Sequence, residues 1–284
     1  LPVPVIVIGN ITVGGTGKTP LVIWLAEFLR ARGYRPGIVT RGYRGKNRHW
    51  PMAVQADTPA IQAGDEAVLL ARLTGCPVVA GPDRVADAEA LLAQGCNLIL
   101  SDDGLQHYRL ARDIEIAVID GERRFGNGLC LPAGPLREPV SRLRQVALRV
   151  TNGDPQAREL GMYLEPGDFR NLADPGLRQP VAAFTGPVHA VAGIGNPERF
   201  FSSLRRLGLQ IETHAFPDHH AFTPMDLAFA DTRPVLMTEK DAVKCEAIAQ
   251  PHFWALAVSA RPDLRLGEQL LQQLKEVDNG QETA

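Results

Sequence analysis

Short apolar runs alternate with helix-like stretches along the first 120 residues of the chain. The runs are almost continuously apolar, which is typical of strands buried on both faces of a parallel sheet. They lie at residues 3–9, 37–40, 76–81, 97–102 and 114–120. The stretches between them predict helices at residues 17–32, 65–73 and 84–93. This alternation predicts an α/β fold in which helices cover both faces of a parallel sheet.

The pattern changes twice in the middle of the chain. Residues 121–139, GERRFGNGLCLPAGPLREP, are too rich in glycine and proline for a regular element. They follow a predicted strand, so they either line a ligand crevice at its carboxyl end or form a long surface connection. Residues 151–179 are polar and turn-rich, and predict a linker with room for a small hairpin.

A second α/β block follows. Strands are predicted at residues 189–195, 209–216, 234–239 and 253–259, with helices at 197–207 and 264–277. Asn196 and Pro197 suit the cap and the first turn of the first of these helices. We therefore predict a first domain at residues 1–152, a linker at 153–179 and a smaller C-terminal α/β domain at 180–284.

Composition narrows the class of protein. Hydrophobic residues make up 45% and charged residues 22% of the chain, as in ordinary globular proteins. The net charge of −2 argues against a surface built for nucleic acid, and no such partner is expected. The four cysteines form no C-x-x-C pair, which fits a reducing compartment. No apolar run reaches the roughly 18–20 residues that span a bilayer.

The strongest motif is GNITVGGTGKTP, from Gly9 to Pro20, between a predicted strand and a predicted helix. This is the setting of a phosphate-binding loop (P-loop), whose generic pattern is G-x-x-x-x-G-K-[ST]. Thr12 stands at the first glycine of the pattern, but three other glycines allow backbone N–H groups to approach phosphates. Lys18 suits the β- and γ-phosphates and the Thr19 hydroxyl suits Mg²⁺. We expect the first domain to bind nucleotide through Thr12, Val13, Gly14, Gly15, Thr16, Gly17, Lys18 and Thr19.

A P-loop also needs an acidic group on a neighbouring strand to organise Mg²⁺. Asp102 and Asp103 follow the apolar run NLIL and are placed to supply it. The competing interpretation, a simple Asp-Asp-Gly turn, is less favoured downstream of a P-loop.

Two classes of P-loop protein are disfavoured by spacing. A GTPase needs [NT]-K-x-D, whereas Lys240 and Asp241 are adjacent. Partitioning ATPases carry a signature lysine where this chain has Val13. A kinase remains, and it needs a base for a hydroxyl proton. The residues alone leave that base open between the Asp65-Glu66 pair and the histidines of FPDHHAF.

Seven motifs in order carry a resemblance to a known family. They are GNITVGGTGKTP, TRGYRG, GDEAVLLA, SDDGLQH, NGLCLPAGPLREP, FPDHHAF and TEKDAVK. Together they resemble the tetraacyldisaccharide 4′-kinases of lipid A biosynthesis in Gram-negative bacteria, in which threonine takes the place of the first P-loop glycine. The resemblance implies transfer of the γ-phosphate of ATP to the 4′-hydroxyl of a tetraacylated glucosamine disaccharide 1-phosphate. It implies ATP and Mg²⁺, a glycolipid substrate, and a peripheral place on the cytoplasmic face of the inner membrane.

The resemblance also implies roles for single residues. Asp65 would be the catalytic aspartate that accepts the 4′-hydroxyl proton, and His219 would orient or tune it, with His220 as the rival. Lys18 would hold charge on the transferred phosphate, and Glu66 would lie near the metal with Thr19. Asp102 and Asp103 would organise Mg²⁺.

The family usually carries a membrane-engaging segment before the first strand, whereas this chain begins at Leu1. The stretch RGYRGKNRHW interleaves cations with aromatic residues, which suits an anionic lipid surface. Arg41 and Arg44 could equally bind the 1-phosphate of the substrate, or the stretch could be a solvated basic loop.

Two other functions compete with the kinase. One is a regulatory or metallochaperone-like P-loop NTPase that acts on a protein partner and hydrolyses ATP without a glycolipid. The other is a soluble sugar or nucleoside kinase, which the basic-aromatic stretch makes less favoured.

Overall fold

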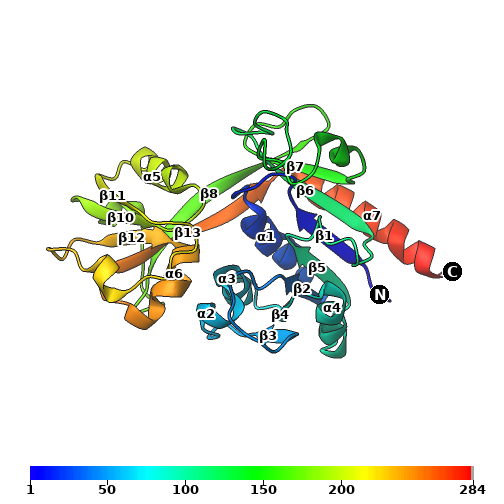
Figure 1. Ribbon diagram of the computed structural model, residues 1–284, viewed down its shortest axis with the longest axis horizontal. Coiled ribbons are helices and arrows are strands. Elements are labelled where there is room, and N and C mark those ends of the chain that lie inside the picture. Colours follow the sequence, from blue (N-terminus) through cyan, green and yellow to red (C-terminus); the bar gives the residue numbers. More distant parts are fainter. Residues whose placement is uncertain (283–284) are drawn as a thin grey trace.

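A mixed β-sheet runs through the part of the chain that the structure, a computed structural model, describes, residues 1–282 (Figure 1). Within it 13 strands are ordered β11-β10-β12-β13-β8-β7-β6-β1-β5-β2-β4-β3, with β9 paired to β8. The strands are β1 (Val5–Gly9), β2 (Pro36–Thr40), β3 (Met52–Val54), β4 (Val78–Ala80), β5 (Leu98–Asp102), β6 (Ile114–Asp120), β7 (Leu148–Asn152), β8 (Leu160–Asn171), β9 (Arg178–Gln179), β10 (Val188–Ala192), β11 (Ile211–Ala215), β12 (Val235–Thr238) and β13 (Phe253–Pro262). The α-helices are α1 (Lys18–Arg30), α2 (Ala60–Ala63), α3 (Asp65–Thr74), α4 (Arg84–Ala93), α5 (Pro197–Arg206), α6 (Glu239–Cys245) and α7 (Leu264–Glu282). Among the strands named for residues 1–282, antiparallel pairs occur only where β3 meets β4 and where β8 meets β13 and β9, so the predicted α/β class is confirmed.

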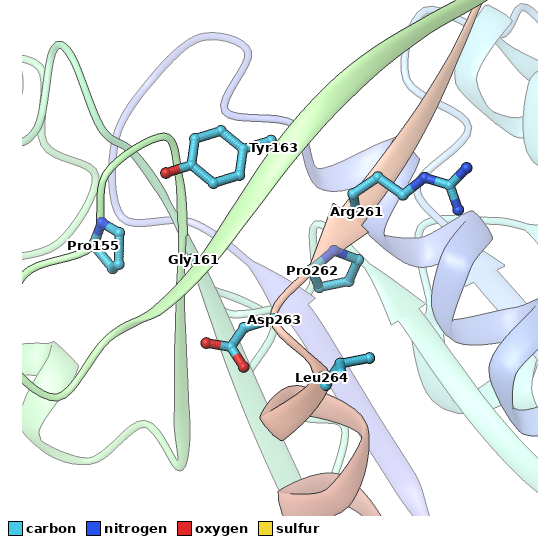
Figure 2. Close-up of a pocket in the computed structure, with 7 residues that line it drawn as sticks. All are labelled: Pro155, Gly161, Tyr163, Arg261, Pro262, Asp263 and Leu264. Atoms are coloured by element: carbon cyan, nitrogen blue, oxygen red, sulfur yellow. The ribbon is translucent and has the colours of Figure 1, made fainter.

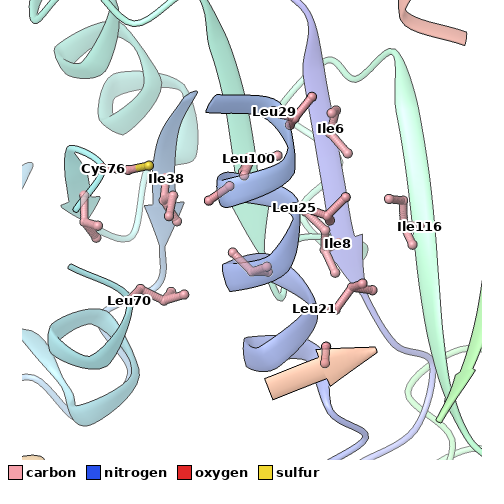
Figure 3. Close-up of a cluster of buried hydrophobic side chains, with 14 of the residues drawn as sticks. Ile6, Ile8, Leu21, Leu25, Leu29, Ile38, Leu70, Cys76, Leu100 and Ile116 are labelled. Atoms are coloured by element: carbon pink, nitrogen blue, oxygen red, sulfur yellow. The ribbon is translucent and has the colours of Figure 1, made fainter. Parts of the chain in front are cut away.

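β1 lies between β5 and β6, parallel to both, at the centre of what we call the first lobe, the sheet from β7 to β3 with its helices. Alternate residues of β1 enter two separate cores, as the two-residue period of a strand requires. Ile6 and Ile8 pack under α1 and α3, while Val5 and Val7 pack under α4. Figure 3 shows the leucines of α1 facing Ile6, Ile8 and Leu100. This sandwich fixes the loop between β1 and α1.

The last helix returns to the first lobe. Leu266, Leu270 and Leu274 of α7 are fully buried in the same core as Ile6 and Leu21. Figure 1 shows α7 lying along the first lobe, after the long strand β13 has crossed from the other side of the molecule. A chain segment that is last in sequence therefore completes the core around the first strand.

The second lobe contains the sheet from β11 to β13 with α5 and α6. Phe200, Phe201 and Leu204 of α5 pack on one face, and Ala242 and Cys245 of α6 pack on the other. The long strands β8 and β13 are antiparallel to each other and join the two lobes (Figure 1).

The segment at residues 153–179, interpreted from sequence as a linker with room for a hairpin, contains the 12-residue strand β8, which pairs with the short strand β9. The central residues of β8 are exposed and include Pro166 and Gly167, so they lack the apolar pattern of a buried strand. The sheet continues across positions 152 and 179, so it marks no boundary at either one. The domain boundaries at these positions therefore stay a prediction.

A cavity of about 420 Å³ lies where β8 and β13 meet α7 (Figure 2). Its lining is Pro155, Gly161, Tyr163, Arg261, Pro262, Asp263 and Leu264. Both charged side chains are already paired, Asp263 with Arg265 and Arg261 with Glu165, so the cavity offers little free chemistry. Among residues 1–282, none of the helices combines the length and apolarity needed to cross a bilayer.

Candidate active site

The loop from Gly9 to Pro20 presents free backbone donors at the start of α1. Gly17 precedes the helix with φ 96°, a left-handed conformation that glycine adopts readily. A Cβ atom there would lie 2.8 Å from Nδ2 of Asn152, so a side chain has no room. The first turn of α1 has no acidic residue and no side-chain cap. The N–H groups of Lys18 and Thr19 and the positive end of the helix are therefore available to bind an anion.

Asn10 organises the side chains of the loop. Its Oδ1 accepts a hydrogen bond from Nζ of Lys18 at 3.1 Å. Its amide nitrogen donates to the hydroxyls of Thr12 at 3.5 Å and Thr16 at 3.4 Å. Thr12, which departs from the generic pattern, thus has a buried hydrogen-bonding role that glycine could not fill.

The two aspartates at the end of β5 have different surroundings. Asp103 pairs with Nζ of Lys18 at 3.2 Å and with Nη1 of Arg137 at 2.9 Å. Although burial acts to raise its pKa, these two cations outweigh burial and lower the pKa of Asp103. Asp102 is 2% exposed, and its Oδ1 has no hydrogen-bond partner. Burial, with the charges of Glu66 and Asp103, raises the pKa of Asp102 to about 7.

Asp65 and His219 meet across 154 residues of sequence. Nδ1 of His219 lies 2.9 Å from Oδ2 and 3.1 Å from Oδ1 of Asp65, so the ring donates its Nδ1–H to the carboxylate. Asp65 begins α3 after Gly64, whose φ is 88° and whose Cβ would lie 2.5 Å from the carbonyl oxygen of Tyr43. Burial acts to raise the pKa of Asp65, but the hydrogen bond from His219 and the charges of Lys240 and Lys244 lower it overall.

His220 points elsewhere. Its Nε2 lies 3.2 Å from Oδ2 of Asp226, and its ring packs against Phe216 and Phe222. Of the two neighbouring histidines, the structure brings only His219 to Asp65.

Helix α6 adds two lysines that the sequence analysis did not assign. Nζ of Lys240 donates to Oε1 of Glu66 at 3.0 Å and lies 3.5 Å from Nε2 of His219. Lys244 pairs with Asp241 at 2.7 Å and lies 4.0 Å from Asp65. Both lysines belong to the TEKDAVK motif, which was the sequence signal for them. Their roles could not be inferred from it, because Glu66 and Asp65 lie far away in the sequence.

The basic-aromatic stretch lies beside this pair. The ring of Tyr43 meets His219 edge-on at 5.1 Å, and the guanidinium groups of Arg41 and Arg44 lie within 6 Å of the Tyr43 ring. Arg44 donates to the backbone carbonyl of Asp218 at 3.0 Å. Arg44, Asp103 and His219 all have positive φ, a strained state that costs about 1–3 kcal/mol each and recurs at functional sites.

One cavity of about 730 Å³ between the lobes joins these groups. Its lining includes most of the P-loop together with Arg41, Tyr43, Glu66, Asp103, Arg137, Asn196, Arg199, Asp218, His219 and Lys240. A phosphate-binding loop and a carboxylate-histidine pair that share one cavity define a P-loop phosphotransferase.

Comparison with known proteins gives the particular family. Residues 1–275 match the family model described as tetraacyldisaccharide-1-P 4′-kinase. The chain is 60% identical over 278 residues to the tetraacyldisaccharide 4′-kinase of Nitrosococcus oceani, covering 97% of this chain and 82% of that protein. It is 55% identical to the enzyme of Alkalilimnicola ehrlichii, covering 95% and 82%. The chain belongs to the tetraacyldisaccharide 4′-kinase family and is a kinase.

A solved structure agrees with this assignment. The crystal structure of LpxK from Aquifex aeolicus, described as an "apo" form in complex with ATP, matches with a TM-score of 0.81. The two chains are 28% identical, and the match covers 96% of this chain and 89% of that one.

Proposed function

We propose that this chain transfers the γ-phosphate of ATP to the 4′-hydroxyl of a tetraacyldisaccharide 1-phosphate in lipid A biosynthesis. The observation that carries the proposal is that His219, which contacts Asp65, lines the same cavity as the P-loop. This arrangement provides a phosphate site and a proton acceptor within one enclosure, which is what a kinase requires and a simple nucleotide switch does not.

The P-loop is proposed to hold the donor. Backbone N–H groups from Gly14 to Thr19 would bind the β- and γ-phosphates, and the start of α1 would add its positive end. Lys18 can leave Asp103 for the phosphates, because Arg137 stays with Asp103 through two hydrogen bonds of 2.9 Å. Lys18 then stabilises charge that develops on the departing phosphate.

The residues present fit a magnesium ion. Asp102 offers a buried carboxylate oxygen without a partner, and burial has raised its pKa to about 7, so a cation beside it would relieve an unfavourable environment. Thr19 and Asp102 would hold the ion, with Asp103 and Glu66 nearby. When bound, it neutralises charge on the β- and γ-phosphates.

The hydroxyl proton is proposed to enter through His219. Asp65 is 5% exposed and both of its oxygens face Nδ1 of the ring, so it stands behind the histidine rather than at the cavity wall. The other ring nitrogen, Nε2, lies 3.5 Å from Nζ of Lys240 in the group of residues that lines the cavity. Nε2 then takes the proton, and Asp65 stabilises the imidazolium that forms. This revises the expectation that Asp65 is the direct acceptor.

The stretch around Arg41 and Arg44 is proposed to meet the acceptor. Arg41 and Tyr43 line the cavity, and Tyr43 is an exposed aromatic side chain beside two cations. Such a surface suits the anionic headgroup of a glycolipid at the cytoplasmic face of the inner membrane. Arg41→Gln should raise the KM for the glycolipid while flotation with anionic liposomes stays unchanged. Equal loss of flotation would instead assign Arg41 to the membrane surface.

The decisive experiment is a transfer assay with ATP labelled on the γ-phosphate. Label should appear in a tetraacyldisaccharide 1-phosphate acceptor dispersed in detergent, and little ATP should be consumed without it. Lys18→Ala should lower kcat by about 10²–10³-fold, whereas Lys275→Ala on α7 should not. ATP hydrolysis that is equally fast without acceptor would support a partner-driven NTPase and overturn the proposal.

A further inference from the structure

Two histidines and a glutamate lie together at the far edge of the second lobe, away from the kinase site. β10 pairs with the edge strand β11 in parallel, with His189 opposite Glu212 and Val191 opposite His214. Glu212 and His214 are two residues apart on one strand, so their side chains project from the same face. The register therefore brings three potential metal ligands from two strands to one place.

The ligand atoms of the three side chains all lie within 4.8 Å of one another. Nδ1 of His189 is 3.0 Å from Nε2 of His214 and 3.8 Å from Oε2 of Glu212. Nε2 of His214 is 3.8 Å from Oε1 of Glu212. Two ring nitrogens and a carboxylate oxygen thus converge on a single point.

Asp231 fixes which nitrogen of His189 faces that point. Oδ1 of Asp231 lies 3.1 Å from Nε2 of His189, so this nitrogen donates its hydrogen and Nδ1 keeps its lone pair. A carboxylate behind a ligating histidine is the usual outer partner in protein metal sites. Phe229 stacks on the His189 ring at 3.9 Å and holds its plane.

The cluster lies at the boundary between core and surface. His189 is 2% exposed, whereas His214 is partly buried and Glu212 is exposed. One cation competes, because Arg233 donates to Oε2 of Glu212 at 2.7 Å. Oε1 of Glu212 stays on the side of His214.

We propose that His189, Glu212 and His214 bind a zinc ion. Two imidazole nitrogens and one carboxylate oxygen form a donor set that zinc accepts in four-coordinate sites, with water in the fourth position. The set is poor for Mg²⁺ and Ca²⁺, which prefer oxygen ligands. The ion would link the edge strand β11 to β10 in a lobe whose outer strand is otherwise held on one side only.

The test uses the full chain without nucleotide and with millimolar Mg²⁺, which occupies oxygen-rich sites. Zn²⁺ titration against a chromophoric chelator should give one equivalent bound, and Co²⁺ should give the visible absorption of a four-coordinate ion. The melting temperature should rise with Zn²⁺, because an ion that binds only the folded state stabilises it.

Variants separate this site from any other. His214 and Glu212 lie on an exposed edge strand, so His214→Gln and Glu212→Gln should each keep the circular dichroism of a folded protein. Each substitution should abolish the cobalt spectrum. Asp231→Asn should weaken zinc binding by about 10–100-fold. His49→Gln, in an exposed loop outside the cluster, should leave binding unchanged. The proposal is overturned if wild-type protein binds no zinc, or if His214→Gln binds it as tightly as wild type.

Discussion

Asp65 is nearly buried yet keeps a depressed pKa, because three cationic or hydrogen-bonding partners surround it. The same contacts fix its orientation toward His219 and keep it charged over the range in which a kinase works. The lower pKa contributes stability that is present above the unfolded-state pKa and lost as the pH falls through the folded-state pKa. At the residue scale, the contacts that orient this carboxylate toward His219 therefore also contribute to the stability of the fold.

We predict that Asp65→Asn and His219→Ala each lower kcat by about 10²–10⁴-fold. The double variant should lose little more than the worse single variant, because residues that act as one unit are strongly non-additive. Steady-state phosphate transfer to the glycolipid measures this. His220→Ala is the matched control and should stay close to wild type, since its ring contacts Asp226 instead. Full additivity of the two losses would argue against a working pair.

The P-loop and the candidate pair of acidic residues could be predicted from the sequence alone, because the residues of each motif are neighbours in the chain. The sequence could not supply Lys240, whose partner Glu66 is 174 residues away. Nor could it separate Asp102 from Asp103, because adjacent aspartates differ here only in what the fold places beside them. In the sequence, His219 and His220 are equally good candidates. The fold distinguishes them, because their rings contact different partners.

At the scale of elements, the connection between β7 and β8 is tied to the glycine-rich segment at residues 121–139. Arg124 pairs with Glu159 at 2.7 Å, and Glu159 also accepts from the hydroxyl of Thr151 at 2.7 Å. Although burial acts to raise it, these bonds lower the pKa of Glu159 to about 2. The segment is therefore anchored where it leaves β6.

We predict that Glu159→Gln lowers the free energy of unfolding by about 2 kcal/mol near pH 7, because Arg124 loses a charged partner. The folded-state pKa lies below the unfolded value, so this stabilisation is complete well above pH 4.5 and fades between about 4.5 and 2. Urea unfolding of both proteins from pH 7 down to pH 3.5 measures the difference. A difference that does not narrow below pH 4.5 would contradict the ion pair.

Helix α7 is the element whose placement matters most to the first lobe. Leu270→Ala should destabilise the protein by about 2–5 kcal/mol, because it leaves a cavity in the core under β1. Leu264→Ala is a matched control on the same helix, since Leu264 is 87% exposed and its loss should cost under about 0.5 kcal/mol. Thermal or urea unfolding distinguishes the two. Equal effects would mean that α7 does not pack as described.

The amphipathic pattern predicted this helix, but not where it packs. Strand β8 was harder still, because its exposed middle and Pro166-Gly167 resemble a linker. The pattern of hydrophobic and polar residues reports only how exposed a segment is. β8 is a strand because β13 and β7 pair with its edges, not because its side chains are buried.

At the scale of the whole molecule, the candidate active site lies between two lobes that share one sheet. Direct contact between the lobes includes Arg199 of α5, whose Nη1 lies 3.3 Å from Oδ2 of Asp120 at the end of β6. Asn196 and Arg199 line the cavity opposite the P-loop. Water must be kept from the transferred phosphate, which favours closure of the lobes over ATP.

We predict that a nonhydrolysable ATP analogue with Mg²⁺ reduces the radius of gyration measured by small-angle X-ray scattering. Arg199→Gln should weaken this compaction, because it removes a contact between the lobes without touching the P-loop. Lys18→Ala should show none if it no longer binds the analogue. Identical scattering of the wild-type protein with and without nucleotide would contradict closure.

The position of α7 also bears on how the molecule is made. Synthesis proceeds from the amino end, and domains generally fold as units while the rest of the chain is still being added. Here the core around β1 includes Leu266, Leu270 and Leu274, so it cannot close until the ribosome has translated α7. The P-loop is translated long before α7, so its core stays incomplete during the synthesis of everything between them. A nascent chain stalled in the second lobe would therefore expose the face that α7 covers, and would be a natural client for a chaperone.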